Sequence, residues 1–174
     1  MGEQDGAHYI AMEFVDGKTL ENLLEREPLP PKRVAEIVAA AADALHYAHE
    51  CGIIHRDIKP ANLMLTREDE RVLIADFGLA RPEGASQITG AGQLLGTPAY
   101  MAPEQASGDH SSIDRRTDVY SLGASLYEML TLEPPFPGKS VFEVLQKVLE
   151  ERPRDPCEVN PSVPRALGDI AMKT

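Results

Sequence analysis

The sequence predicts an α+β domain that is mostly helical, with a few short strands beside a polar loop. A long run of apolar residues at helical spacing begins at Pro30–Pro31 and ends near Cys51–Gly52. Two short β-rich runs are joined by a charged turn, at 63–65 and 72–75. Proline-rich links separate three further helical patterns, at about 116–131, 140–150 and 162–173.

The remaining segments follow in chain order. Residues 8–15 alternate apolar and polar side chains and predict a strand that runs into a connector. Residues 18–26 predict a short amphipathic helix. Pro60 makes the segment 53–62 a loop, and residues 78–100 predict a long loop because they show little periodicity. The long helix between these segments carries its apolar residues at helical spacing: Val34, Ile37, Val38, Ala41, Leu45 and Ala48.

The chain is acidic, with a formal net charge of −11 and a pI near 4.9. Binding to nucleic acid requires clustered Lys and Arg, and because no such stripe occurs we expect no nucleic-acid partner. A solvated acidic surface explains this charge better than a preference for basic substrates. No apolar run approaches the roughly 20 residues that a membrane-spanning helix needs, so we expect no membrane contact from this segment.

Cysteine and histidine residues do not form a recognisable cluster. Cys51 and Cys157 are too few and too isolated for a disulfide framework or a zinc site, and both are expected to be reduced. His46 and His49 lie within the long helix, where a histidine is usually solvated or packed. We therefore assign no chemistry to these four residues.

Four motifs follow one another along the chain. Residues 55–62 read His-Arg-Asp-Ile-Lys-Pro-Ala-Asn, and Asp76-Phe77-Gly78 follows fourteen residues later. Residues 96–104 read Gly-Thr-Pro-Ala-Tyr-Met-Ala-Pro-Glu, and residues 118–123 read Asp-Val-Tyr-Ser-Leu-Gly. The first two motifs supply two carboxylates, a lysine and an amide at the spacing that phosphoryl transfer from a nucleotide requires.

In these motifs the chain resembles the large lobe of a protein kinase. The I-K-P-x-N form at 58–62 and the G-T-P-A-Y form at 96–100 resemble serine/threonine kinases, and the run Pro103–Gln105 is most similar to bacterial eukaryotic-like members. The resemblance implies transfer of the γ-phosphoryl group of ATP, with Mg²⁺, to Ser or Thr hydroxyls of a protein substrate.

The resemblance also implies which residues carry the reaction. Asp57 would be the catalytic base, and Lys59 would stabilise charge on the transferring phosphate. Asn62 and Asp76 offer the hard oxygen ligands that suit Mg²⁺. Thr97 would support catalysis by hydrogen-bonding Asp57 and Lys59.

Further residues are assigned to the nucleotide and to the framework of the site. Glu13 and Val15 fall at hinge positions that would read the adenine edge. Met12 would guard the back of the pocket, and Met64 and Ala75 would form the floor under the base. Taken alone, the two methionines would be read as core packing. Asp118 is expected to be buried and to hold the backbone of the His55-Arg56 turn, and the arginine that usually pairs with Glu104 would lie beyond Thr174. The residues given structural roles are His55, Phe77, Gly78, Glu104 and Asp118.

Arg56 suggests a phosphorylation switch. It directly precedes Asp57, as in kinases whose activation loop is ordered when a phosphate pairs with this guanidinium. Thr89, seven residues before Gly96, is the favoured acceptor, and Ser86 is an alternative. Either is otherwise an ordinary loop residue.

Residues 1–174 are therefore predicted to form a partial protein kinase domain. Its parts are a hinge strand at 8–15, a catalytic loop at 53–62, an activation segment at 76–104 and a helical large lobe at 105–174. No glycine-rich loop or V-A-I-K-type strand precedes the hinge. A small lobe would have to be supplied in cis or in trans.

Three interpretations remain open. The favoured one is a fragment of a serine/threonine kinase that is weak or inactive alone. The others are a catalytically inert kinase-like scaffold or interaction module, and a split enzyme whose small lobe comes from another chain. We expect the segment to be cytoplasmic, with any membrane tether outside it.

Overall fold

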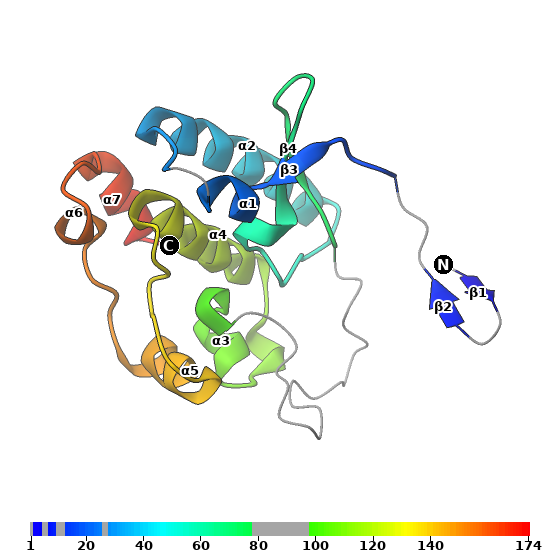
Figure 1. Cartoon of the computed structure of the whole chain (residues 1–174). Coiled ribbons are helices and arrows are strands. Elements are labelled where there is room, and N and C mark those ends of the chain that lie inside the picture. Colours follow the sequence, from blue (N-terminus) through cyan, green and yellow to red (C-terminus); the bar gives the residue numbers. More distant parts are fainter. Residues whose placement is uncertain (1, 5–6, 10–12, 26–27, 78–97) are drawn as a thin grey trace.

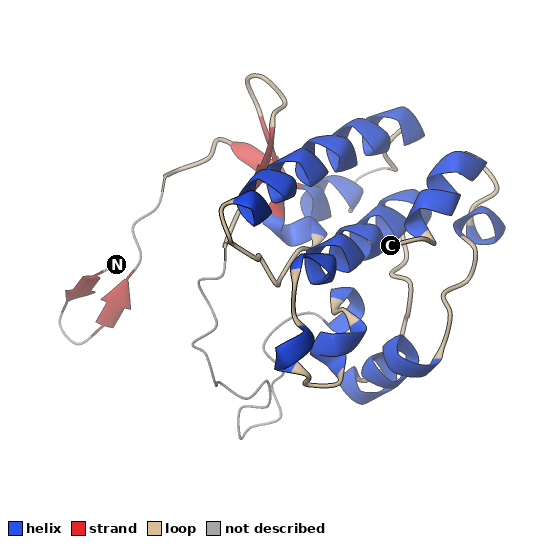
Figure 2. Ribbon diagram, turned by 180° about the vertical axis from the view of Figure 1, so that it is seen from behind, coloured by secondary structure: helices blue, strands red, loops and turns tan. Residues whose placement is uncertain are grey.

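The computed structural model describes residues 2–4, 7–9, 13–25, 28–77 and 98–174. Most of the described residues lie in one helical body, with a short hairpin set apart from it (Figures 1 and 2). The hairpin pairs strands β1 (Gly2–Gln4) and β2 (Ala7–Tyr9) in antiparallel fashion. An antiparallel sheet of order β3-β4-β5 lies at one end of the body, and its strands are β3 (Gly17–Thr19), β4 (Leu63–Thr66) and β5 (Val72–Ile74).

The helices confirm the predicted fold class. They are α1 (Leu20–Leu24), α2 (Pro31–Glu50), α3 (Pro103–Ala106), α4 (Arg115–Thr131), α5 (Val141–Glu150), α6 (Pro156–Val159) and α7 (Arg165–Ala171). Short 3₁₀ turns are η1 (Pro60–Asn62), η2 (Pro98–Tyr100) and η3 (His110–Ser112). The predicted long helix, the strands β4 and β5, and the helices α4 and α5 are confirmed within about one residue. None of the described helices combines the length and the apolar character that crossing a membrane requires.

Two predictions near the N-terminus need correction. The strand predicted over 8–15 is regular only in β2, and residues 13–16 have no regular structure, while residues 10–12 lie outside the described part. In the described residues, the pairing of β2 with β1 ends at Tyr9, and a strand is maintained only where a partner takes up its hydrogen bonds. The helix predicted over 18–26 begins at Leu20, because Gly17–Thr19 pair with β4 and Thr19 caps the helix. Residues 26–27 lie outside the described part.

The C-terminal helix is also shorter than predicted. Helix α7 begins after Pro164, which serves as its N-cap, rather than at residue 162. The preceding segment forms the four-residue helix α6, capped by the Asp155 side chain. Elements as short as α6, α3 and the 3₁₀ turns contain too few residues to show a hydrophobic period, so the sequence pattern did not predict them.

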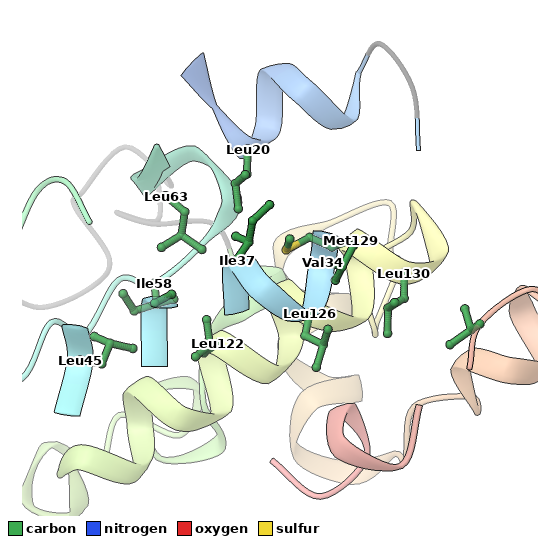
Figure 3. Packing of buried hydrophobic residues seen from close by; sticks show 12 residues of the cluster. Leu20, Val34, Ile37, Leu45, Ile58, Leu63, Leu122, Leu126, Met129 and Leu130 are labelled. Atoms are coloured by element: carbon green, nitrogen blue, oxygen red, sulfur yellow. The ribbon is translucent and has the colours of Figure 1, made fainter. Parts of the chain in front are cut away.

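The core lies between α2 and α4 (Figure 3). Helix α2 buries one face at helical spacing, and α4 is buried over most of its length. Ile58 enters the same cluster from the loop at 53–62 and is only 1% exposed. The loop is therefore anchored in the core by its own side chain. The core residues labelled in Figure 3 are Leu20, Val34, Ile37, Leu45, Ile58, Leu63, Leu122, Leu126, Met129 and Leu130.

We expect Ile37→Ala to lower the free energy of unfolding by about 2–5 kcal/mol, because it removes buried methyl groups and leaves a cavity. Ile37 is 0% exposed in the middle of the core. The measurement is urea denaturation followed by circular dichroism. Tyr47→Ala on the same helix is the control, since Tyr47 is 74% exposed and its loss should change stability by less than about 0.5 kcal/mol. Equal losses in the two variants would contradict this core.

Candidate active site

One buried carboxylate holds the 53–62 loop to helix α4. Asp118, in the first turn of α4, is 0% exposed. Its Oδ2 accepts the backbone N–H of His55 at 2.9 Å, and its Oδ1 accepts the backbone N–H of Arg56 at 2.7 Å. The imidazole Nε2 of His49, near the end of α2, lies 2.7 Å from Oδ2. The two hydrogen bonds from the backbone N–H groups attach the His55-Arg56 turn to the Asp118 carboxylate.

The peptide at Arg56 is held from two helices. Arg56 has a φ of 68°, a left-handed conformation that costs a residue other than glycine roughly 1–2 kcal/mol. Its N–H is bound by Asp118, and its carbonyl oxygen accepts Nε2 of Gln105 at 2.9 Å. Gln105 is itself buried in α3, and its Oε1 accepts the N–H of Ala102 at 3.1 Å. Helices α3 and α4 therefore stabilise this unfavourable backbone together.

The side chain of His55 joins the loop to the end of β5. It is buried, and its Nε2–H donates to the carbonyl oxygen of Ala75 at 2.9 Å. Its Nδ1 accepts the N–H of Asp57 at 3.2 Å, which leaves Nε2 as the nitrogen that donates. The imidazole and the Phe77 ring meet in an edge-to-face arrangement, with 4.7 Å between ring centroids. Two of the predicted structural residues, His55 and Phe77, are therefore in contact.

Asp57, Lys59 and Asn62 form a hydrogen-bonded cluster. Nζ of Lys59 donates to Oδ2 of Asp57 at 2.9 Å, and their side chains are 18% and 37% exposed. Nδ2 of Asn62 donates to the same Oδ2 at 3.1 Å and to the backbone oxygen of Asp57 at 2.8 Å. The Asp57 carboxylate is therefore oriented by two side chains yet remains accessible to solvent.

Asp76 directly follows a residue whose backbone is bonded to Asn62 of this cluster. It is exposed and has a φ of 61°, so the chain turns sharply there. The preceding residue, Ala75, donates its N–H to the backbone oxygen of Asn62 at 2.8 Å, which ties β5 to η1. Within the described residues, no group of three or more His, Cys, Asp and Glu side chains is placed to hold a metal. Two oxygen ligands fit Mg²⁺, which usually takes one or two protein ligands and completes its shell with phosphates and water.

Glu104 has a partner that sequence reasoning did not foresee. It is half-buried in α3, and its Oε1 accepts the hydroxyl of Thr117 at 2.5 Å. Within the described residues, the hydroxyl of Thr117 therefore satisfies the Glu104 carboxylate, while an arginine beyond Thr174 stays a prediction. Arg154 and Arg165 pair elsewhere, with Glu133 and with Asp155 and Asp169 respectively.

Tyr100 connects η2 to helix α4. Its hydroxyl donates to Oε2 of Glu128, and its carbonyl oxygen accepts the hydroxyl of Ser121 at 2.8 Å. Burial, reinforced by the nearby charge of Glu21, raises the pKa of Glu128 above its ordinary value, although the hydrogen bond from Tyr100 opposes this. Burial and the Glu128 carboxylate also raise the pKa of Tyr100.

Only some of the residues predicted for the nucleotide and for regulation lie in the described part of the chain. Glu13 is exposed and Val15 is half-buried, in a segment whose Asp16 oxygen accepts the N–H of Arg67 at 2.9 Å. Met64 is half-buried in β4, opposite Leu73 and Thr19. Five residues lie outside the described part of the chain: Met12, Gly78, Ser86, Thr89 and Thr97.

Sequence reasoning missed two residues of this site. Gln105 lies in a helix too short to show a period, and only its place in the run Pro103–Gln105, at the end of the third motif, could have drawn attention to it. His49 was set aside as solvated or packed. It follows Leu45 by four residues, so helical spacing alone places it beside the buried face of α2.

Comparison with known proteins identifies the family. The protein kinase domain family matches residues 1–168. The chain is 44% identical over 168 residues to the serine/threonine-protein kinase PknB of Mycobacterium tuberculosis, and 42% identical over 174 residues to a probable serine/threonine-protein kinase of Clostridium perfringens. A crystal structure of the Mycobacterium tuberculosis PknI kinase domain superposes with a TM-score of 0.70 at 33% identity.

The chain therefore belongs to the protein kinase family. Within it, its relatives are bacterial serine/threonine kinases of the eukaryotic-like kind, as the motifs predicted. The alignments cover 95% and 99% of this chain but only about a quarter of each relative, 26% and 25% respectively. The PknI alignment covers 98% of this chain and 58% of that one.

The raised pKa of Glu128 predicts a pH-dependent stability. Because the folded protein keeps this proton at pH values where the unfolded chain has released it, the contribution of Glu128 is most favourable below the ordinary value of 4.5 and is lost as the pH rises through the folded-state pKa. Glu128→Gln removes this titration and keeps an oxygen that can accept from Tyr100.

We therefore expect the unfolding free energy of Glu128→Gln, relative to the unmutated chain, to increase as the pH rises from about 4 to 7. Urea denaturation at several pH values measures this difference. A difference that stays constant, or that decreases with pH, would contradict a raised pKa for this carboxyl group.

Proposed function

We propose that this chain carries the catalytic loop of a serine/threonine protein kinase, which transfers the γ-phosphoryl group of ATP to Ser or Thr hydroxyls of a protein substrate. The observation that carries this proposal is the cluster in which Lys59 and Asn62 both donate to the Asp57 carboxylate. Phosphoryl transfer depends on positioning and on neutralising charge. This cluster supplies a fixed acceptor and a cation side by side.

Each member of the cluster has a distinct role. The Asp57 carboxylate orients the substrate hydroxyl and accepts its proton, as a general base. Lys59 lies close enough to donate to Asp57 and also presents an ammonium group to the transferring phosphate, where negative charge develops. Asn62 fixes the rotamer of Asp57 through its amide nitrogen.

Asn62 and Asp76 are the proposed Mg²⁺ ligands. Because the amide nitrogen of Asn62 is bonded to Asp57, its Oδ1 is the atom left to ligate. Asp76 contributes an exposed carboxylate one residue after the backbone bond between Ala75 and Asn62. When bound, Mg²⁺ neutralises and orients the phosphates.

The adenine is proposed to bind near the segment 13–16 and β4. Glu13 and Val15 would offer backbone groups to the adenine edge, Met12 would line the back of the pocket, and Met64 would form its floor. The bond from Arg67 to the Asp16 oxygen supports this placement, because it ties the segment to the turn after β4.

Arg56 is proposed to receive a phosphate from the activation segment. Among the described residues, its Nε is a buried nitrogen with no hydrogen-bond partner, and burying such a donor is unfavourable. A phosphate on Thr89, or on Ser86, would satisfy it with a charge-assisted bond. Thr97 is proposed to hydrogen-bond Asp57 and Lys59, and Gly78 to permit the turn after Phe77.

Two partners complete the proposal. One is a protein substrate, and the other is a small lobe, in cis or in trans, that covers the nucleotide phosphates. The coverage of only 58% of the PknI kinase-domain chain supports the need for further kinase residues. The compartment proposed for this reaction is the cytoplasm.

The test is phosphoryl transfer by the chain, measured alone and after fusion to the small lobe of a relative such as mycobacterial PknB. We expect Mg·ATP-dependent mass increases on Ser or Thr in the fusion, and little or none in the chain alone. Asp57→Asn should lower the rate by about 10² or more, because it removes the general base.

Asp43→Asn is the matched control. Asp43 is exposed on α2, away from the cluster, so its loss should leave the rate unchanged. Transfer that persists in Asp57→Asn would contradict the assigned base. A folded fusion with no transfer in any variant would favour the alternative of an inert scaffold or interaction module.

A further inference from the structure

His49 is a buried histidine that the proposed reaction does not use. It lies in the last turn of α2, its side chain is 9% exposed, and its Nε2 is 2.7 Å from Oδ2 of Asp118. A carboxylate only accepts hydrogen bonds, so the imidazole N–H is the donor. Helix α2 therefore contributes directly to the carboxylate that holds the 53–62 loop.

Asp118 depends on this donor. Its carboxylate is 0% exposed, and a buried carboxylate is tolerated only when its oxygens are hydrogen-bonded. Backbone N–H groups supply one bond to each oxygen, from Arg56 and from His55. In the described part of the chain, His49 is the basic side chain within 4 Å of Asp118. It is thus the side-chain donor that limits rotation of the carboxylate.

His49 borders a cavity as well as Asp118. The ring lines an open cavity of about 390 Å³ between α2, α4 and α7. The hydrogen bond to Asp118 is the polar contact that holds the imidazole beside this cavity. His46, one turn earlier on α2, lines the same cavity and is exposed. It offers a second imidazole beside the same cavity for comparison.

We propose that His49 is a positioning residue: its imidazole N–H fixes the Asp118 carboxylate, and through it the backbone turn that presents Asp57. The proposal rests on the proposed function only where it regards that turn as catalytic. Without the N–H, Asp118 keeps two backbone donors but loses the third hydrogen bond, which further restrains its orientation. The left-handed peptide at Arg56 then loses part of what stabilises it.

Two amide substitutions separate this role from general packing. In His49→Gln, Nε2–H lies four bonds from Cα, as it does in the imidazole, so the donor can still reach Asp118. His49→Asn has the same chemical group one bond shorter, so the donor falls short. His46→Asn makes the control change one turn earlier on α2, beside the same cavity.

The readout is amide hydrogen exchange by NMR on the chain itself, which requires no phosphoryl transfer. We expect the His55 and Arg56 amides to exchange about tenfold faster or more in His49→Asn, as the loss of a hydrogen bond to a charged group implies. His49→Gln and His46→Asn should remain close to the unmutated chain. Amides of α5, such as those of Val144 and Val148, serve as the internal reference.

Two results would overturn the proposal. Unchanged exchange at His55 and Arg56 in His49→Asn would show that Asp118 does not need this donor. Equal acceleration in α5, or an unfolded His49→Asn beside a folded His49→Gln, would show that the histidine serves the stability of the whole fold. Because exchange is measured without ATP, neither result depends on whether the chain proves to be a kinase.

Discussion

The buried Asp118 carboxylate is the interaction on which the arrangement of the site depends. It binds two consecutive backbone N–H groups, of His55 and Arg56, and places them against helix α4. An uncompensated charge at this depth would be strongly unfavourable, so the carboxylate and its donors have to stay together. Asp57, the next residue along the chain, takes its position from them. The geometry of the site is in this sense set by the core of the helical body.

Other contacts also hold the 53–62 loop in place. Gln105 holds the carbonyl side of the left-handed Arg56 peptide, and Ile58 anchors the loop in the core between α2 and α4. His55 extends the network to Ala75, just before Asp76. The proposed base and the proposed metal ligands therefore sit on segments that are bonded to one another. This is the kind of pre-organisation that phosphoryl transfer needs, since it relies on position and charge.

Much of this was predictable from the sequence, for identifiable reasons. The helical period along α2 and the β-rich runs of β4 and β5 gave those elements, and the four motifs gave the family and the residues that cluster around Asp57. The hinge strand was predicted too long, because an alternation of apolar and polar residues does not reveal whether a neighbouring strand is present to pair with it. Three hydrogen bonds of the site join residues that lie 13 to 69 positions apart in the sequence. They link Gln105 to Arg56, Thr117 to Glu104, and His49 to Asp118. Local patterns carry no information on such contacts.

The central claim is that Asp118 determines the conformation of the 53–62 loop, and ¹H–¹⁵N NMR of Asp118→Asn tests it most directly. The amide group keeps the size of the side chain, but its nitrogen turns a donor toward one of the two backbone N–H groups. The account predicts that the resonances of residues 55–62 shift or broaden, while those of α5 and α7 remain in place. An unchanged spectrum for residues 55–62 in a folded Asp118→Asn would contradict the account.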